Sequence, residues 1–189
     1  MQSLTRALET SRLLLRPPSY CDLSFAQELY ARPEMKPGAG ERETEPPARI
    51  ARRFRLEIRH WQDFGFGRYL IERDGNPIGF AGITLNGPVA GLNLSYHLNP
   101  DHWGRGLAQE AVAAILDAAE ADHGRATVGA VVHPGNHASR RVLHKAGFRF
   151  CAAVQLGGCD WLFHRRDGAE DAAVLTAAHP TACAVRTAA

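Results

Sequence analysis

The hydrophobic pattern in the first third of the chain predicts one strand and two helices. Residues 11–16 form a short apolar run that stops at a proline pair, which is typical of a strand. Apolar positions recur at helical spacing over 22–30, where Asp22 is a suitable cap, and again over 48–64. The segment between these helices, 33–47, is rich in proline and poor in apolar residues, so we expect a surface loop there.

The middle of the chain predicts three strands. Residues 67–72 and 78–85 are largely apolar and lie on either side of a turn sequence at 74–77, so together they predict a hairpin. Residues 92–98 alternate apolar and polar side chains, which indicates a further strand with one buried face.

The second half of the chain predicts two helices and three strands. A helical period runs over 107–123, and the apolar segment at 126–132 suits a buried strand. A shorter helix lies within 136–145, and two more strands follow at 148–154 and 161–165. This order of elements predicts an α/β fold with one mixed sheet that is neither doubly wound nor a barrel, and it indicates no second domain.

Composition narrows the classes of protein. The 189 residues are enough for one domain with a core, and 45% hydrophobic with 22% charged residues is ordinary for a soluble globular protein. The formal net charge of +2 gives no electrostatic argument for a nucleic acid or an acidic membrane as partner. No apolar run approaches the ~20 residues that span a bilayer, and the N-terminus lacks the pattern of a signal peptide.

Cysteine and histidine spacing predicts neither disulfides nor a metal site. The four cysteines lie far apart and form no CxxC pair, which favours reduced thiols in a cytoplasmic protein. His133 and His137 are separated by a Pro-Gly pair and have no evident carboxylate partner, so we expect no metal. The cysteines are Cys21, Cys151, Cys159 and Cys183.

The segment after the strand at 92–98 has the clearest chemical signal. Gly104 and Gly106 flank Arg105, and the helix at 107–123 begins immediately after them. Glycines let the backbone approach a ligand closely, and the first N–H groups of a helix have no partner within the helix. Together these features predict a cup of backbone donors for a phosphate or pyrophosphate. The two glycines are also compatible with a simple tight turn.

Three phosphate-binding motifs compete for this segment. The chain has no Gly-Lys-Ser/Thr, which a Walker A loop requires. A dinucleotide fingerprint requires Gly or Ala three residues after Gly106, where this chain has Gln109. The sequence WGRGLA, from Trp103 to Ala108, instead resembles the Q/R-x-x-G-x-G/A acyl-CoA signature of the GNAT N-acetyltransferase superfamily.

Further segments resemble the RimJ/RimL-type branch of that superfamily, the ribosomal-protein-alanine N-acetyltransferase-like enzymes. This resemblance implies the GNAT acyl-CoA N-acyltransferase fold, a central mixed β-sheet flanked by helices, in a single domain over 8–166. We expect 167–189, which is rich in Ala and Thr, to be a tail that packs on this domain or is disordered. The matching segments are LETSRLLLRP from Leu8, HW at His60 with GFG from Gly65, NPDHWGRG from Asn99, and HPGNHAS from His133 with Leu143, Lys145 and Gly147-Phe148.

The resemblance implies transfer of an acetyl group from acetyl-CoA, a co-substrate, to a primary amine. The pantetheine arm of the co-substrate is expected beside His97 and Leu98, like an added strand. Asn136 is expected to contact it through the side-chain amide, and Ser139 to donate a hydrogen bond to the departing thiolate. The backbone residues implied at the pyrophosphate are Gly104, Arg105, Gly106, Leu107 and Ala108.

Several of these residues also have simpler structural interpretations. Asn136 is well suited to cap a helix, and Ser139 to be an ordinary residue of its first turn. Trp61 and Trp103 are expected to be packing residues, and the arginines of the helix at 48–64 to form mostly a solvated face.

Two positions depart from the pattern of the superfamily. Many members have a tyrosine acid where this chain has Leu143, although the RimJ/RimL-type branch often lacks it too. That branch usually has Glu-x-Gly-Tyr in its central strand, and this chain has Asn93 in the position of that catalytic glutamate. An amide cannot act as a base near neutral pH. His97, Glu43 and Glu45 are alternatives among which the sequence does not choose.

Two functional classes therefore stay open. One is an active N-acetyltransferase for a protein N-terminus or a small-molecule amine, and the other is a catalytically degenerate acyl-CoA-binding protein with a sensing or regulatory role. We expect the loop at 33–47, the helix at 48–64 and the final hairpin to form the acceptor pocket, although none of them identifies the amine. The resemblance is compatible with a homodimer, and we expect no nucleic acid or membrane partner.

Overall fold

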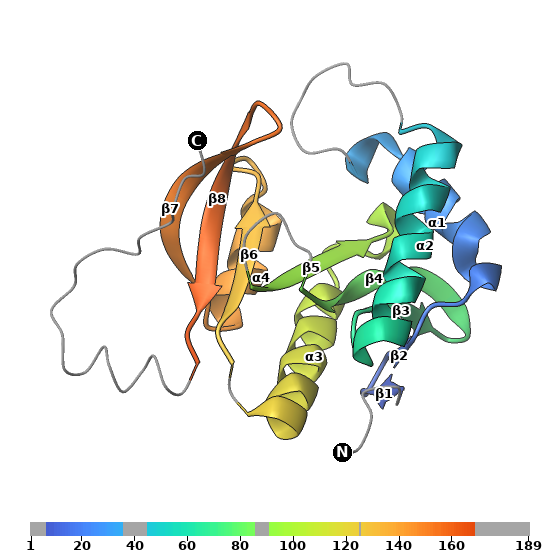
Figure 1. The fold of residues 1–189 in the computed structure, drawn as a ribbon, viewed down its shortest axis with the longest axis horizontal. Coiled ribbons are helices and arrows are strands. Elements are labelled where there is room, and N and C mark those ends of the chain that lie inside the picture. The colour runs from blue at the N-terminus through green and yellow to red at the C-terminus, as the bar shows by residue number, and fades with distance from the viewer. Residues whose placement is uncertain (1–6, 36–44, 86–90, 125, 169–189) are drawn as a thin grey trace, which may run out of the picture.

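The computed structural model describes residues 7–35, 45–85, 91–124 and 126–168, which form an eight-stranded sheet with helices on both faces (Figure 1). The strands lie in the order β1-β2-β3-β4-β5-β6-β8-β7. β5 and β6 run parallel, whereas the other neighbouring strands are antiparallel. The predicted mixed α/β sheet is therefore confirmed. The strands are β1 (Leu8–Glu9), β2 (Leu14–Arg16), β3 (Arg68–Arg73), β4 (Asn76–Thr84), β5 (Leu92–Leu98), β6 (Val128–Val132), β7 (Arg149–Leu156) and β8 (Cys159–Arg166).

Helices cover both faces of this sheet. One pair, α1 and α2, packs on one face, and the other pair, α3 and α4, packs on the opposite face. The α-helices are α1 (Leu23–Ala31), α2 (Pro47–Phe64), α3 (Leu107–His123) and α4 (His137–Lys145). Three short 3-10 helices lie in the connections, η1 (Tyr20–Asp22), η2 (Pro33–Met35) and η3 (Pro100–His102).

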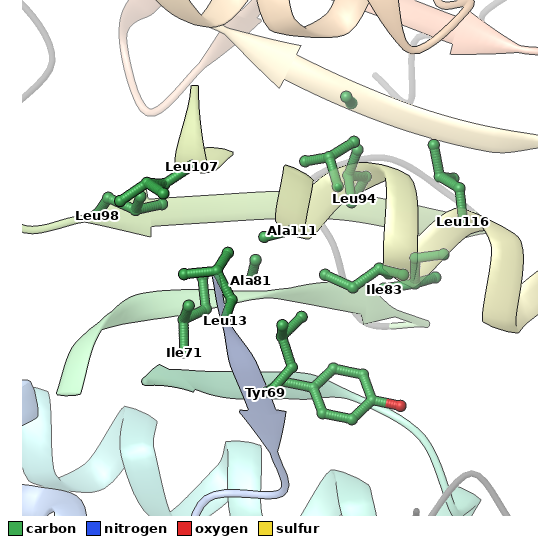
Figure 2. Packing of buried hydrophobic residues seen from close by; sticks show 14 of the residues in the cluster. Leu13, Tyr69, Ile71, Ala81, Ile83, Leu94, Leu98, Leu107, Ala111 and Leu116 are labelled. Atoms are coloured by element: carbon green, nitrogen blue, oxygen red, sulfur yellow. The ribbon is translucent and has the colours of Figure 1, made fainter. Parts of the chain in front are cut away.

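The alternation of side chains along the strands divides the core into two clusters. Leu70 on β3 pairs with Phe80 on β4, and both pack against α1 and α2. The neighbouring pair Tyr69 and Ala81 points to the opposite face and packs with α3 (Figure 2). Leu107, the first residue of α3, belongs to this second cluster, so the start of the helix is anchored in the core.

β5 and β6 stay together for only part of their length. Their ladder has two residue pairs, Leu92 with Val128 and Asn93 with Gly129. β5 then continues beside β4 as far as Leu98, with no β6 partner in the ranges described. Beyond Asn93, the edge of β5 therefore offers backbone N–H and C=O groups to another extended chain.

The strand predicted over 11–16 is shorter in the structure, because β2 covers only Leu14–Arg16 and residues 11–13 belong to the turn that follows β1. The Thr10 N–H donates to the Leu13 carbonyl at 2.9 Å, and the Thr10 hydroxyl accepts from the Leu13 N–H at 2.9 Å. These bonds fold the intervening Ser11 and Arg12 out of the sheet, so that both reach α3.

The other predicted elements are confirmed with shifted ends. The hairpin turn is shorter than 74–77 because Asp74 and Gly75 both adopt left-handed φ, 52° and 75°, as a two-residue turn requires. The strand predicted from residue 126 begins at Val128, and β7 and β8 are longer than predicted. Part of the predicted loop, 36–44, and most of the predicted tail, 169–189, lie outside the described residues.

The described part of the chain offers no helix that is long and apolar enough to cross a bilayer. It also holds no group of three or more His, Cys, Asp or Glu side chains in a position to bind a metal ion. Cys21 is a free thiol, and Cys183 lies outside the described ranges.

The fold makes a prediction about two phenylalanines. Phe80 is 0% exposed and packs against the rings of Phe25, Tyr30 and Phe54. We expect Phe80→Ala to lower the free energy of unfolding by about 3–5 kcal/mol, because it leaves a cavity under α1 and α2. Phe150→Ala, the same change at an exposed site on β7, is expected to cost less than about 1 kcal/mol. Urea unfolding measures both, and equal losses would contradict the assignment of Phe80 to the core.

Candidate active site

The loop between β5 and α3 forms the predicted cup. Gly104 and Gly106 have φ values of 73° and 76°, and Gly106 is the N-cap of α3. A residue with a Cβ is strained at such φ values, so the loop requires glycine at both positions. Left-handed residues that alternate with Arg105 turn successive N–H groups toward one side, where the N-terminal dipole of α3 adds positive potential. The geometry suits an anion such as a pyrophosphate.

Trp103 fixes the entrance to this loop. Its indole Nε1 donates to the carbonyl of Leu98, the last residue of β5, at 2.7 Å, although 51% of the side chain is exposed. Two residues earlier, Asp101 forms an ion pair with Arg32 just beyond α1, at 2.9 Å. Trp103 therefore does more than the packing that the sequence predicts, because it holds the loop against the strand end.

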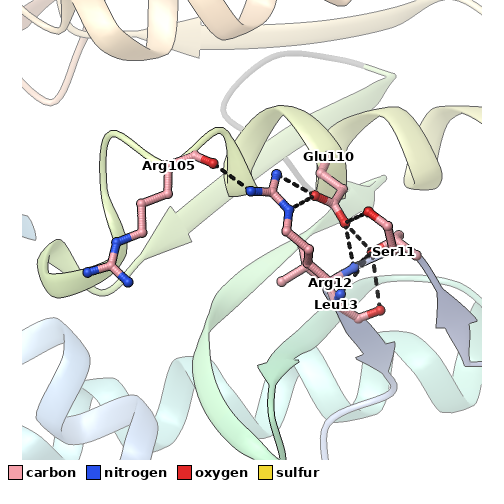
Figure 3. Close-up of polar contacts among 6 residues, drawn as sticks. Ser11, Arg12, Leu13, Arg105 and Glu110 are labelled. Atoms are coloured by element: carbon pink, nitrogen blue, oxygen red, sulfur yellow. Dashed lines mark hydrogen bonds and ion pairs between the residues drawn. The ribbon is translucent and has the colours of Figure 1, made fainter.

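Glu110, in the first turn of α3, connects the loop to the N-terminal segment (Figure 3). Its Oε1 accepts from the Thr10 hydroxyl at 2.6 Å, the Ser11 hydroxyl at 3.1 Å and the Arg12 N–H at 3.0 Å. Its Oε2 accepts from the Arg12 guanidinium at 2.7 Å. Burial opposes ionisation of Glu110, but the bonds from Thr10 and Arg12 outweigh it, and the pKa of Glu110 lies below its ordinary value.

Arg12 also orients the peptide group at the centre of the cup. Its Nη1 donates to the Arg105 carbonyl at 2.9 Å (Figure 3). The chain has no cis peptide bond in its described ranges, so the N–H of Gly106 points opposite to that carbonyl. Because the Arg105 carbonyl points toward Arg12, the Gly106 N–H points away from Arg12.

Asn136 caps α4, as one of its two interpretations predicts. Its Oδ1 accepts from the Ser139 N–H at 2.9 Å. The Nδ2 group has no partner in the described structure, so it stays available to a ligand. The Ser139 hydroxyl is likewise unpartnered among the described residues and is half-buried at the start of α4.

Tyr96 connects the two halves of the sheet where β5 and β6 separate. Its hydroxyl donates to the Ser139 carbonyl at 3.0 Å, from β5 to α4. Burial raises the pKa of Tyr96 to about 12, so the hydroxyl keeps its proton at neutral pH. This bond holds the N-terminal end of α4, at Ser139, close to β5.

Asn93, Ser95 and His97 point to the face of β5 that α1 and α2 cover, because they alternate with core residues such as Leu94. Asn93 is 4% exposed, and its Oδ1 is buried without a hydrogen-bond partner in the described structure. A buried amide oxygen of this kind can accept an N–H from a ligand, but it cannot take the proton of an ammonium group.

The predicted alternative bases are already engaged. The Nδ1 of His97 lies 2.9 Å from Nη2 of Arg68, which is a donor. Burial and the charges of Arg68 and Arg53 lower the pKa of His97 well below its ordinary value. Glu45 forms ion pairs with Arg53 at 2.9 Å and Arg49 at 3.6 Å, and Glu43 lies outside the described residues.

The site includes residues that sequence reasoning did not identify. Arg12 and Glu110 gave no local signal, because their contact joins positions 98 residues apart. Arg53 and Arg68 point inward, although the arginines of α2 were expected to form mostly a solvated face, as exposed Arg52 and Arg55 do. The signal available for Arg68 is a charged residue at the start of the largely apolar segment 67–72.

Comparison with a family model identifies the protein class. The model described as "Acetyltransferase (GNAT) domain" matches residues 12–149, more than half of the chain and the whole region from the Arg12 contact to the start of β7. The chain belongs to the GNAT acetyltransferase family. This result confirms the family that the glycine loop and its neighbouring segments predict.

Two curated relatives of this GNAT protein come from Bacillus subtilis strain 168. The uncharacterized protein YkkB is 31% identical over 103 residues, which cover 51% of this chain and 59% of YkkB. The alignment therefore spans less than two thirds of the length of YkkB. The uncharacterized N-acetyltransferase YoaA is 27% identical over 147 residues, which cover 75% of this chain and 82% of YoaA.

Solved GNAT structures share the fold. An acetyltransferase from Agrobacterium tumefaciens strain C58 is 28% identical with a TM-score of 0.73, over 85% of this chain and 93% of that chain. RimJ from Mycobacterium smegmatis, in complex with CoA-disulfide, is 23% identical with a TM-score of 0.68, over 90% and 91% of the two chains. A RimJ enzyme is thus among the proteins with this fold, in agreement with the predicted architecture.

The lowered pKa of Glu110 makes a prediction about stability. A carboxylate of this kind stabilises the folded state above its ordinary pKa, and this contribution is lost as the pH falls through its folded-state pKa. We expect Glu110→Gln to reduce the free energy of unfolding at pH 7 by about 1 kcal/mol, since 44% of the Arg12 side chain is exposed and solvent screens its charge. The difference from wild type should shrink as the pH is lowered toward about 3.

Urea unfolding across this pH range measures the effect. Glu28→Gln, the same change at an exposed position of α1, is the control and should show no such difference. Indistinguishable behaviour of the two variants would contradict the role of Glu110.

Proposed function

We propose that this GNAT protein transfers an acetyl group from acetyl-CoA to a primary amine. The observation that supports this most directly is the position of the glycine cup, which follows immediately on the free edge of β5. An anion-binding helix terminus beside an unpaired strand edge suits a ligand with a pyrophosphate at one end and an extended, amide-bearing arm at the other.

The cup residues are proposed to bind the pyrophosphate through their backbone. The N–H groups of Arg105, Gly106, Leu107 and Ala108 precede or begin α3, where they have no intrahelical acceptor. Arg12 keeps the Gly106 N–H directed away from the N-terminal segment through its bond to the Arg105 carbonyl. The pantetheine arm then lies along β5 toward His97 and Leu98, with the free Nδ2 of Asn136 as a further donor.

The acyl-transfer step requires a nucleophilic amine and a stabilised leaving group. The thioester supplies the acyl group, the amine nitrogen bonds to its carbonyl carbon, and the carbon–sulfur bond breaks. The nitrogen loses one proton to water as the amide forms, and the thiolate takes up a proton from water and leaves as free CoA. The Ser139 hydroxyl is proposed to donate to the departing sulfur, since it has no partner of its own in the described structure. Asn93 Oδ1 accepts an N–H of the incoming amine and orients it.

Residue 93 is an asparagine and has no carboxylate, and the Nδ1 of His97 already accepts from Arg68. The amine is therefore proposed to lose its proton to water before or during binding. The rate is then governed by the fraction of neutral amine, so kcat/KM for the acceptor should rise with pH toward the pKa of the amine.

A catalytically degenerate acyl-CoA-binding protein with a sensing role is the second candidate function. Asn93 and Leu143 favour it, because they stand where related enzymes have a carboxylate and a tyrosine. Both candidates include binding of CoA, and they differ in turnover.

Release of free CoA distinguishes the two. The test is to incubate the full chain with acetyl-CoA and a panel of primary amines, which includes peptides with free N-termini and small-molecule amines. A chromogenic disulfide measures the free CoA thiol that is released. We expect thiol release that depends on the amine and increases between pH 7 and 9, by the arguments above. Measurable affinity for CoA with no amine-dependent release over the panel would establish the second candidate instead.

A substitution in the cup tests the binding site itself. Gly106→Glu places a side chain and a negative charge where the pyrophosphate is proposed to lie, so the affinity for acetyl-CoA should fall at least about 100-fold. Gly75→Glu is the matched control, because Gly75 has nearly the same φ, 75° against 76°, and lies in the β3–β4 turn. Calorimetric titration measures both variants. Unchanged affinity in Gly106→Glu would refute the phosphate assignment.

A further inference from the structure

A buried cation joins three elements on the face of the sheet that α1 and α2 cover. The Arg68 side chain, from β3, is 8% exposed. Its Nη1 donates to Glu57 Oε1 on α2 at 2.9 Å, and its Nη2 donates to the Tyr30 hydroxyl on α1 at 2.8 Å. The same Nη2 lies 2.9 Å from Nδ1 of His97 on β5. Glu57 and Tyr30 therefore hold the Arg68 guanidinium in place beside the imidazole of His97.

This contact determines where His97 carries its hydrogen. A guanidinium has donors and no acceptor, so the Nδ1 that faces it must be unprotonated. A neutral imidazole with Nδ1 as acceptor carries its hydrogen on Nε2. The tautomer of His97 therefore follows from its partner.

The surroundings also keep His97 neutral. The charged and titratable groups that face it are Tyr30 from α1, Arg53 and Glu57 from α2, and Arg68 from β3. The carboxylate among them, Glu57, is bonded to Arg68. Two positive charges and burial thus oppose a third positive charge on the ring.

The Nε2–H group of His97 is not used by the described part of the chain. It has no hydrogen-bond partner among the described residues, and it is not one of the buried polar atoms that lack a partner. His97 as a whole is half-buried. The side chain shares its face of β5 with Ser95 and with Asn93, the last residue that β5 pairs with β6.

We propose that His97 is a substrate-positioning residue whose Nε2–H donates a hydrogen bond to an oxygen atom of the acceptor amine. This inference rests on the proposed acetyl transfer and specifies its acceptor class. The preferred substrates are primary amines with a carbonyl, ether or hydroxyl oxygen near the amino group, rather than simple alkylamines. His97 acts as a fixed donor and not as the base of the reaction.

The first part of the test needs no turnover. Proton–nitrogen NMR of the imidazole groups in the full chain should show His97 with hydrogen on Nε2 and still neutral as the pH falls through the ordinary pKa of histidine. Protonation of His97 near its ordinary pKa, or a hydrogen on Nδ1, would overturn the proposal.

The second part uses 2-methoxyethylamine and butylamine, which have similar length and differ in one oxygen atom. With CoA present, the methoxy compound should shift the His97 Nε2 resonance and butylamine should not. Equal shifts, or no shift with either amine, would overturn the proposal even if no acetylation occurs.

Variants complete the test if both amines are acetylated. In His97→Leu, the ratio of kcat/KM for the methoxy compound to that for butylamine should fall about tenfold, as expected for one lost hydrogen bond. His97→Gln should restore the ratio, because the glutamine oxygen can accept from Arg68 while its nitrogen donates. A ratio that is unchanged in His97→Leu, or that Gln does not restore, would mean that the imidazole has only a structural role.

Discussion

The separation of β5 from β6 after Asn93 is the constraint on which the rest of the site depends. Two residue pairs hold the strands together, and β5 then continues beside β4 with no second strand partner in the described part of the chain. The unpaired edge is stable because other groups fix what surrounds it: Trp103 binds the carbonyl at the strand end, and Tyr96 connects the strand to α4. The same edge lies next to the glycine cup, so one irregularity in the sheet places an anion site and a free strand edge in line.

The N-terminal segment has a larger part in this arrangement than its short strands suggest. The turn between β1 and β2 directs three consecutive side chains, Thr10, Ser11 and Arg12, onto one carboxylate of α3. Glu110 lies at the positive end of the helix, where a negative charge is favourable. Through Arg12, the carboxylate also controls a carbonyl of the cup (Figure 3). The stability of the first turn of α3 and the orientation of the loop are therefore coupled.

The face of the sheet that α1 and α2 cover carries charged and polar side chains. Charge on this face is compensated in pairs, by the buried pair of Arg68 with Glu57 and by the partly exposed pair of Arg53 with Glu45. Asn93 offers an acceptor and His97 a donor on the same face of one strand. Such a face can bind and orient an amine without removing its proton, which agrees with a proposed reaction whose rate depends on the neutral amine.

The sequence by itself determined the order of elements, the mixed sheet, the glycine cup and the family, because hydrophobic periodicity, turn residues and helix starts are local properties. It could not decide between a cap and a ligand contact for Asn136, nor choose a base near Asn93. Only the tertiary structure paired Arg12 with Glu110, 98 residues away, and shortened the predicted first strand to Leu14–Arg16. It also turned His97 from a conceivable base into a donor, because the tautomer depends on Arg68, a residue of another strand whose position the chain topology alone decides.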